Sequence, residues 1–408
     1  MKVLICIPCL LTGGTEIQTL NTVHALVQGG HQVTVACYFE HTPDMVARYR
    51  RAGAEVILFS PKGVRVGGYK SILFLYKHLR RAIRTIRPDV THVQYMAPGA
   101  MVVLLLWLMG VKNIIATAHT AADIYKDLRL IHFLQRHCLR AWTCITERAE
   151  RSFFGTSQLY SPDLVLGRRN HFTIYNALPA QMRCNDNVDD NCAAELLCSN
   201  DNVDDNENFC SSLTAHRSSL TNSKPYTKLT LGVVSRLEPI KGMDLVVPAL
   251  AEVLKVHPDT QLLVVGDGSL RASMEQQAVE LGCADHIRFV GRQPQEELPQ
   301  WYGQMDIVLM PSRSEGFGLT AIEAMACGCV MVASDTGGLP EVVRDGVCGL
   351  LHRTEDVADM ASKITSLIGD PTLYDKLRTQ SLQEVEKYSF ERYAATICDL
   401  YKRLGFSV

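Results

Sequence analysis

The sequence lacks any apolar run long enough to cross a lipid bilayer. Its most apolar stretch is residues 100–109. This stretch is well short of the roughly 20 residues that a spanning helix needs, so it predicts a buried helix instead. The first apolar run starts at Lys2, which leaves no room ahead of it for a basic leader and a cleavage site. These absences predict a cytoplasmic protein without a transmembrane segment.

A large net charge is also absent. The chain has 41 Lys and Arg against 43 Asp and Glu, so nothing indicates nucleic acid as a partner. The charges are unevenly placed, since residues 1–180 have 21 basic and 10 acidic side chains and residues 228–408 have 17 and 25. This division predicts an N-terminal half that meets an anionic surface or acceptor, and an ordinary solvated surface explains it equally well.

A disulfide framework is missing too. The 14 cysteines are scattered through apparent strands and helices, whereas disulfide frameworks belong to short secreted chains, so reduced thiols are expected. Stability must then come from apolar cores. The hydrophobic content of 47% and charged content of 21% are close to those of ordinary globular domains.

Short apolar runs rich in β-branched residues alternate with longer helical stretches, which is the pattern of a parallel α/β sheet. One series has strands at 3–8, 32–37, 55–59, 90–94, 113–118, 141–146 and 172–175, and a second has strands at 230–235, 261–266, 287–290, 307–311, 330–334 and 349–351. The pattern predicts two Rossmann-like domains in tandem, residues 1–180 and 228–389. A final segment, residues 390–408, contains one more helix, which we expect to pack back on the N-terminal domain.

Residues 181–227 interrupt this alternation. The acidic sequence at 185–191 recurs at 200–206, and its polarity and lack of periodicity predict a mobile linker or insertion. Clustered Asp and Asn oxygens leave a calcium site as an alternative, although the glycine turn and final Glu of a loop site are missing. Four cysteines flank the copies at spacings that match no standard zinc site, and these are Cys184, Cys192, Cys198 and Cys210.

The strongest chemical signal is residues 312–323, directly after an apolar strand. A glycine turn there opens a helix, whose free backbone N–H groups form a site for a phosphate. Glu323 lies one turn deeper on the face of Leu319, where a carboxylate can accept hydrogen bonds from ribose hydroxyls. Glu315 precedes the helix and can reach a sugar. The candidate donor-binding residues of this segment are Glu315, Gly316, Phe317, Gly318, Leu319, Thr320 and Glu323.

A pair of cations follows the first strand of the second domain. Arg236 offers a planar donor fork and Lys241 a compact charge, and together they can neutralise a diphosphate as it leaves. Each alone is more simply a surface residue beside a turn, and their combination with the Glu315–Glu323 segment favours the functional interpretation. Gly266 and Gly268, after another strand, permit close approach of the backbone to a ligand or form an ordinary turn.

Two features of the first domain lie at strand ends. Gly13 and Gly14 follow the first strand and open a helix, where backbone amides can face a phosphate or an acceptor hydroxyl; an ordinary capped helix start is the alternative. The turn is not G-x-G-x-x-G, so the dehydrogenase fingerprint is absent. His119 ends the strand at 113–118 and is a candidate catalytic residue, as a polar contact to sugar or acceptor, although a lone histidine is usually structural.

With these residues the sequence resembles the large family of retaining GT-B glycosyltransferases, the glycosyl transferases group 1 or family 4 type. The resemblance spans nearly the whole chain, and its most specific parts are Glu315 and Glu323, which match the family's E-x7-E motif, with Arg236 and Lys241. It implies two Rossmann-like domains facing each other across a cleft. In the family, the matching positions contact the donor sugar (Glu315), the ribose (Glu323) and the diphosphate (Arg236, Lys241 and the Leu319 amide).

The resemblance implies a hexosyltransferase that takes a nucleotide-sugar donor and a glycan or lipid-linked acceptor, as in polysaccharide biosynthesis. No Asp-x-Asp occurs, the spacing with which another class of glycosyltransferases holds a metal, so we expect no metal and no other cofactor. Retention by same-face displacement is favoured over a covalent intermediate. A nucleotide-sugar epimerase of similar fold and a non-catalytic nucleotide-sugar-binding protein remain alternatives.

The stretch at 69–87 predicts a basic amphipathic helix. Its apolar positions recur at helical spacing, with six basic residues mostly elsewhere. One interpretation is a core face backed by a solvated face. The other is peripheral docking on an anionic membrane, on its inner side, near a lipid-linked acceptor. The proposed apolar positions are Ile72, Leu75, Leu79, Ile83 and Ile86.

Overall fold

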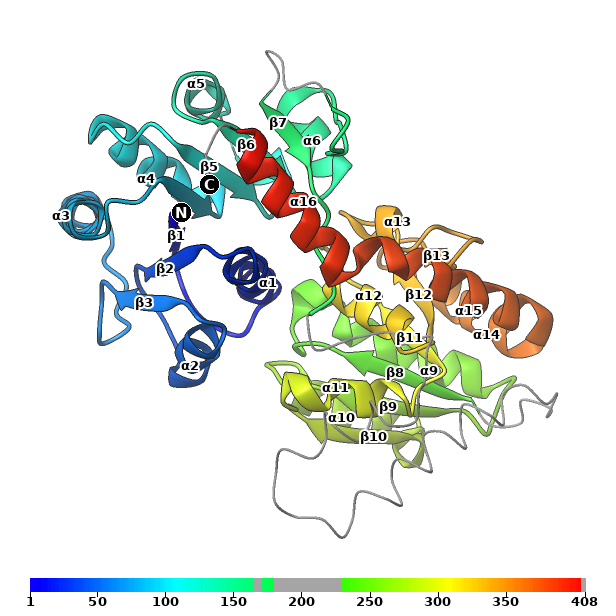
Figure 1. The fold of residues 1–408 in the computed structure, drawn as a ribbon. Helices are drawn as coiled ribbons and strands as arrows, with labels where there is room; N and C mark the ends of the chain where they lie inside the picture. The colour runs from blue at the N-terminus through cyan, green and yellow to red at the C-terminus, as the bar shows by residue number, and fades with distance from the viewer. Residues whose placement is uncertain (126, 165–169, 180–228, 405–408) are drawn as a thin grey trace, which may run out of the picture.

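The structure is a computed structural model that describes residues 1–125, 127–164, 170–179 and 229–404. The segment 181–227, for which the sequence predicts a mobile linker and leaves calcium and zinc sites as alternatives, lies outside these residues. The strands of both predicted sheets lie within them. Figure 1 shows two α/β domains, one in blue to green and one in green to orange. Each contains a parallel sheet covered by helices on both faces.

The N-terminal domain is built on a seven-stranded parallel sheet of order β3-β2-β1-β4-β5-β6-β7. Its strands are short and almost wholly buried, because helices cover both faces and the β-branched runs have no solvated side. The strands are β1 (Lys2–Ile7), β2 (Gln32–Cys37), β3 (Glu55–Leu58), β4 (Val90–Gln94), β5 (Ile114–Ala118), β6 (Ala141–Cys144) and β7 (His171–Thr173).

In the part of the chain that the structure describes, six α-helices connect these strands. Several have local start signals, as in α2, where Thr42 accepts a hydrogen bond from the Met45 N–H and Pro43 fills the first turn. The helices α3, α4 and α5 contribute to the apolar core on one face of the sheet, and α1 and α2 to the core on the other. Their bounds are α1 (Gly14–Gln28), α2 (Pro43–Arg51), α3 (Tyr69–Ile86), α4 (Met96–Leu108), α5 (Arg129–His137) and α6 (Glu147–Phe154).

The C-terminal domain repeats this plan with a six-stranded parallel sheet of order β10-β9-β8-β11-β12-β13. The chain order reverses between β8 and β11, the type of position where open α/β sheets bind ligands. The strands are β8 (Thr230–Val234), β9 (Gln261–Val265), β10 (Ile287–Gly291), β11 (Ile307–Met310), β12 (Val330–Ser334) and β13 (Gly349–His352). The helices are α9 (Val246–Leu254), α10 (Arg271–Glu280), α11 (Leu298–Tyr302), α12 (Leu319–Ala326), α13 (Leu339–Val342), α14 (Val357–Gly369) and α15 (Pro371–Val385).

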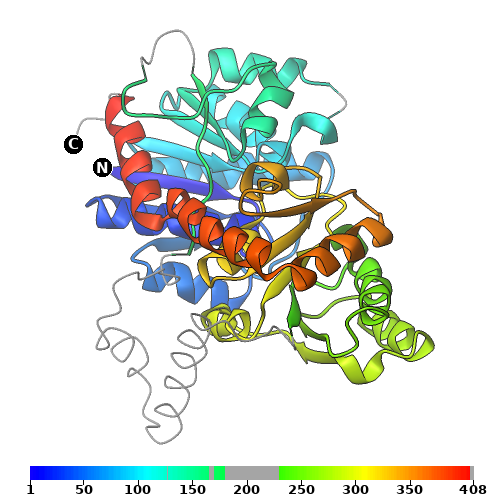
Figure 2. The ribbon, with the colours of Figure 1, turned by 90° about the vertical axis from the view of Figure 1, so that its right-hand side faces the viewer.

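The final helix, α16 (Phe390–Arg403), leaves the C-terminal domain and packs against α1 of the N-terminal domain. It is the red helix that crosses between the domains in Figures 1 and 2. Ser389 caps its start by accepting from the Arg392 N–H. Its apolar side chains Tyr393, Ile397, Leu400 and Tyr401 join the core that contains β1 and α1.

The predicted fold class is confirmed: the chain forms two Rossmann-like α/β domains with parallel sheets. The predicted strands match the observed ones to within two residues at each end, and three of them, at 32–37, 90–94 and 330–334, have the same bounds. The helix expected at 69–87 is α3, and the apolar run at 100–109 lies mostly in α4. Among the described residues, no helix has the length and apolar character to span a membrane.

Candidate functional site

The loops after β5 and β11 meet where the two domains join. A Cβ placed on Gly316 would lie 2.6 Å from the carbonyl oxygen of His119, so this approach requires glycine. Beside it, a Cβ on Gly14 would lie 3.4 Å from Leu319 Cδ1. The structure therefore places the glycine turn of the first domain and the turn at 315–320 directly opposite each other.

Lys241 and Glu315 form an ion pair at this boundary. Lys241 Nζ donates to Glu315 Oε2 at 2.6 Å, and both side chains are largely buried, at 20% and 14% exposed. Lys241 ends a short 3-10 turn that Gly242 closes with φ 65°. A Cβ on Gly242 would lie 2.0 Å from the Pro311 carbonyl oxygen. This contact brings the loop after β8 against the loop after β11 and so brings the two charges together.

Arg236, in the loop after β8, is exposed. Burial raises the pKa of Glu16 across the domain boundary, and the positive charge of Arg236 partly offsets this rise. Arg236 therefore places a cation within electrostatic reach of the start of α1. The sequence analysis singled out Arg236 and Lys241 together; both lie in the loop after β8, and Lys241 is the one that contacts Glu315.

Gly266 and Gly268 approach protein backbone rather than open space. Gly266 has φ 137°, and a Cβ there would lie 1.8 Å from the Ser235 carbonyl oxygen. A Cβ on Gly268 would lie 2.5 Å from the carbonyl oxygen of Leu237. These glycines let the loop after β9 pack on the loop that contains Arg236. Of the two interpretations offered by the sequence, ligand approach and an ordinary turn, this packing favours the turn.

The helix α12 starts at the domain boundary without a side-chain cap. Gly318 stands at its N-cap with φ 101°, a left-handed conformation that other residues rarely adopt. The amides of Leu319 and Thr320 therefore lie in the first turn, where the helix dipole favours an anion. Phe317 has a different environment: it is buried and packs against Tyr388 at a ring distance of 5.5 Å. Its side chain contributes to the domain interface and does not line open space.

Glu323 lies deeper than the sequence indicated. Its side chain is buried, at 5% exposed, and Oε2 accepts a hydrogen bond from the Tyr302 hydroxyl at 3.0 Å. Burial raises the pKa of Glu323 to about 7, and hydrogen bonds from Tyr302 and Gln295 only partly offset the effect. A carboxyl group with this pKa is shared between its neutral and ionised forms near neutral pH.

Glu16 is a buried carboxyl group that the sequence analysis did not single out. It lies in the first turn of α1, is 4% exposed, and accepts from the Cys9 thiol at 3.1 Å. Its Oε2 would be 2.5 Å from a Cβ on Gly13. Glu16 thus occupies the start of α1, where a phosphate was one predicted ligand, and burial raises its pKa. The signal in the sequence was an acidic residue in the first turn after two glycines.

Tyr95 was also missed. It follows β4 with φ 63°, a strained conformation for a residue with a side chain. Its ring lies 5.4 Å from that of His119, and its hydroxyl bonds to Thr15. The residues next to Tyr95 in the sequence do not predict its positive φ, because this conformation depends on tertiary contacts.

His119 contributes its backbone to the boundary, whereas its ring is buried in the N-terminal domain. The side chain is 5% exposed, and Nε2 bonds to Gln94 Oε1 at 2.8 Å. Burial lowers the pKa of His119 to about 3, so the ring is neutral at physiological pH. The sequence analysis expected the imidazole to contact the sugar or the acceptor. In the structure it is the backbone carbonyl oxygen of His119 that lies at the domain boundary, against Gly316, while the ring is buried.

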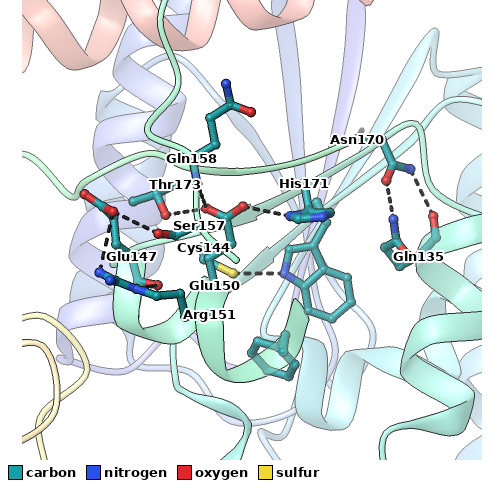
Figure 3. Close-up of polar contacts among 12 residues, drawn as sticks. Gln135, Cys144, Glu147, Glu150, Arg151, Ser157, Gln158, Asn170, His171 and Thr173 are labelled. Carbon is teal, nitrogen blue, oxygen red and sulfur yellow. Dashed lines mark hydrogen bonds and ion pairs between the residues drawn. The ribbon is translucent and has the colours of Figure 1, made fainter. Parts of the chain in front are cut away.

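A separate set of contacts joins the domains beside α6. The Glu341 carboxylate, from the second domain, accepts from the backbone amides of Glu147 and Arg148 at 2.8 Å and 2.6 Å. Figure 3 shows how α6 is fixed in turn to its own sheet, because fully buried Glu150 lies between His171 and Thr173 of β7. The second domain thus holds a helix that is itself rigidly attached to the first.

Within the residues that the structure describes, no group of three or more His, Cys, Asp or Glu side chains could hold a metal ion. Metal independence nevertheless stays a prediction.

Two protein families match the chain, one in each domain. Residues 218–384 match the family described as glycosyl transferases group 1, and residues 12–155 match glycosyltransferase family 4. One similar curated protein is a D-inositol 3-phosphate glycosyltransferase of Corynebacterium jeikeium, 36% identical over 44% of this chain and 45% of that protein. Another, from Mycolicibacterium smegmatis, is a GDP-mannose-dependent alpha-(1-6)-phosphatidylinositol monomannoside mannosyltransferase, 38% identical over 34% of this chain and 38% of its own length. The chain spans less than half the length of the curated relatives it matches.

Solved structures match over the whole length. HepE of Anabaena, solved in complex with UDP, has a TM-score of 0.73 at 18% identity and covers 99% of this chain and 100% of its own. A sucrose-phosphate synthase of Thermosynechococcus elongatus has a TM-score of 0.71 at 19% identity, with 100% of both chains covered. This likeness concerns the fold. The chain thus has the GT-B fold of two Rossmann-like domains, and its two matched segments are similar to glycosyl transferases group 1 and to glycosyltransferase family 4.

Proposed function

We propose that the protein is a retaining, metal-independent glycosyltransferase that moves a hexose from a nucleotide-sugar donor to an acceptor. The observation that carries the proposal is the Lys241–Glu315 ion pair, which joins the loop after β8, where Arg236 also lies, to the segment that leads into the uncapped start of α12. The two curated relatives named above are a glycosyltransferase and a mannosyltransferase, and HepE was solved with UDP. These names support a nucleoside diphosphate as the group that the site binds.

The proposed mechanism follows from the charges. When the bond between sugar and diphosphate breaks, negative charge develops on the leaving phosphate. Arg236, Lys241 and the first amides of α12 stabilise that charge in the position that a metal ion fills elsewhere. Glu315, held by Lys241 at 2.6 Å, accepts hydrogen bonds from donor sugar hydroxyls. The acceptor attacks from the same face, and the departing phosphate oxygen takes its proton.

Glu323 binds the ribose in this proposal. Its carboxyl group is buried, and its Oε2 accepts from the Tyr302 hydroxyl. The ribose hydroxyls therefore bind the other carboxyl oxygen, Oε1, or reach the group after a small movement of the start of α12. Gly13, Gly14, Gly266 and Gly268 then act through loop packing and backbone amides rather than through side chains.

The test is turnover with a panel of nucleotide sugars, followed by release of nucleoside diphosphate. Arg236→Ala, Lys241→Met and Glu315→Gln should each lose most turnover and keep the thermal unfolding midpoint within a few degrees. Full activity in excess chelator is expected. Rates near wild type in all three variants refute the proposal. Donor isomerisation without any acceptor identifies an epimerase, and donor binding without release of nucleoside diphosphate identifies a non-catalytic binding protein.

The acceptor that we propose is a glycan or a lipid-linked saccharide, reached from the cytoplasmic side of a membrane. Support comes from α3, which contains no acidic residue. Of the predicted apolar positions, Leu75 and Leu79 are buried, as the core interpretation requires, whereas Ile72 is 39% exposed. Tyr69 and Leu73 are also exposed, at 81% and 71%. The neighbouring basic residues that are exposed are Lys70, Lys77, Arg80, Arg81 and Arg84.

Two further helices extend this surface. Exposed Trp107 of α4 meets exposed Phe133 of α5 edge to face at 6.2 Å, and α3, α4 and α5 cover the same face of the first sheet. An apolar ridge with flanking cations suits an anionic lipid surface, to which each nearby cation contributes about 1 kcal/mol.

Sedimentation with vesicles tests the membrane part by itself. Phosphatidylcholine vesicles containing phosphatidylserine should retain the protein, and pure phosphatidylcholine should not. The variant with Leu73→Ser, Trp107→Ser and Phe133→Ser should lose binding. A control with Val256→Ser and Val279→Ser, two exposed apolar residues of the second domain, should bind like wild type. Binding that ignores phosphatidylserine, or equal loss in both variants, refutes this docking surface.

A further inference from the structure

A small cavity lies in the N-terminal domain close to the domain boundary, and α16 forms part of its wall. Gln18 and Thr22 of α1, Gln94 of β4, His119, and Tyr393 of α16 are part of its lining. Most of its lining side chains are polar, which distinguishes it from the dry apolar voids of protein cores. The cavity has room for about one water molecule.

Two side chains of this lining have a buried polar atom with no partner within 3.5 Å among the described residues, His119 Nδ1 and Gln18 Nε2. Gln18 also has a weaker polar contact with Tyr393, which leaves at least one hydrogen of its amide nitrogen without an acceptor. Buried polar groups in folded proteins are nearly always bonded to protein or to ordered water, so each atom requires an explanation. Neither side chain can rotate to find a partner without losing an existing bond. His119 Nε2 is bonded to Gln94 at 2.8 Å, and Gln18 Oε1 accepts from the Ala177 N–H at 3.0 Å.

These bonds fix the chemical role of each unpaired atom. The Ala177 amide can only donate, so Oε1 is the atom of Gln18 that faces it, and Nε2 is a donor in search of an acceptor. Gln94 presents Oε1 to His119 Nε2, so that nitrogen carries the proton and Nδ1 has a free lone pair. One donor and one acceptor on the lining of a one-molecule cavity are the complement of a single water.

We propose that this cavity is a water-binding site, in which one ordered water accepts from Gln18 Nε2 and donates to His119 Nδ1, the nitrogen that stays unprotonated because Gln94 accepts from Nε2–H. Burial, which lowers the pKa of His119 to about 3, keeps Nδ1 available as an acceptor at physiological pH. His92, whose charge also acts on the His119 ring, is itself buried with its pKa lowered to about 3.

The water connects distant parts of the chain to the candidate site. Gln18 lies one helical turn after Gly14, and Tyr393 of α16 bonds to Thr22 on the same helix at 2.8 Å. The carbonyl oxygen of His119 lies against Gly316. Gln18 is therefore a positioning residue, which holds the His119 peptide in its place beside the Glu315 turn. This kinetic role depends on the proposed function, whereas the water and the tautomer do not.

The direct tests use the unaltered protein. A high-resolution crystal structure should contain a water within about 3 Å of both His119 Nδ1 and Gln18 Nε2. Nitrogen-15 spectra of the imidazole rings, with His119 assigned through His119→Asn, should show Nε2 protonated and Nδ1 unprotonated without change from pH 5 to pH 8. An empty cavity, or a protonated Nδ1, overturns the proposal even if the protein transfers sugars.

A pair of variants separates the water from its surroundings. Gln18→Met removes the donor to the water, and also the acceptor for Ala177 and Asn21. Asn21→Leu is the matched control, because Asn21 bonds to Gln18 Oε1 and to the Ala177 and Leu178 carbonyls without lining the cavity.

Gln18→Met should move the His119 Nδ1 signal, because that nitrogen loses its hydrogen-bond donor while Gln94 still accepts from Nε2–H. It should also lower kcat/KM for the donor by about tenfold, as expected for a small displacement of a positioned group. Asn21→Leu should leave the His119 signals unchanged. Equal spectra in the two variants refute the role of the water. If the Nδ1 signal moves in Gln18→Met but neither the unaltered protein nor any variant transfers sugar, the water site stands and the proposed function fails.

Discussion

Glu323 allows a prediction that is independent of any substrate. Burial raises its pKa from about 4.5 to about 7, so the folded chain keeps a proton on this group at pH values where the unfolded chain has released it. The free energy of unfolding must then fall as the pH rises through this interval. One pKa unit corresponds to about 1.4 kcal/mol, and the shift predicts a loss of about 2.5 kcal/mol between pH 5 and pH 8 from this group alone.

The Glu323→Gln variant isolates that contribution. Glutamine has the same shape, stays neutral, and keeps an oxygen to accept from the Tyr302 hydroxyl, which lies 3.0 Å from Glu323 Oε2. Denaturant unfolding of both proteins at pH 5, 6, 7 and 8 should give a difference that grows in favour of the variant by about 2.5 kcal/mol over this range. A difference that does not change with pH refutes the reasoning, because it means that the carboxyl group ionises without cost in the folded state.

Two other substitutions test the geometry of the domain boundary. Gly337→Ala places a Cβ 1.9 Å from the Glu315 carbonyl oxygen at φ 55°, so it should lower both the unfolding midpoint and the turnover. The control is Gly346→Ala, at φ 68° with nothing within 4 Å of the new Cβ, which should cost only about 1 kcal/mol of backbone strain. Similar unfolding midpoints for the two variants contradict the close packing at Gly337. Glu341→Gln removes the charge that the amides of Glu147 and Arg148 bind and should cost about 1 kcal/mol. Faster hydrogen exchange at these two amides checks it, and unchanged exchange contradicts the contact.

The sequence predicts the local structure well because strands and helix starts depend on near neighbours. The run Ile307–Met310 is apolar and bounded by a glycine turn, so both β11 and the start of α12 follow from residues within one segment. The pairing of Arg236 and Lys241 with one sheet edge follows from the rule that parallel strands share their carboxyl ends. Periodicity also identified α3 and its buried residues Leu75 and Leu79.

The environment of each site residue depends on contacts that span long stretches of chain. Glu323 is bonded to Tyr302 in α11, and Gly316 meets His119 from the other domain. Neither contact could be predicted from the residues next to it in the sequence. Tyr95 is held at positive φ by its tertiary surroundings, and its sequence looks like that of any strand end. The chemistry of the candidate site could therefore be predicted by residue type, and its burial and partners could not.

The crossing of α16 affects how the protein is made. The apolar residues Ile397, Leu400 and Tyr401 complete the core around α1, yet they are synthesised after the entire second domain. A nascent chain that has emerged only as far as Ser389 can finish its later domain while its earlier one still exposes an uncovered apolar strip. The first domain to leave the ribosome is therefore the last to be completed, and a premature stop before α16 would release a polypeptide prone to aggregation.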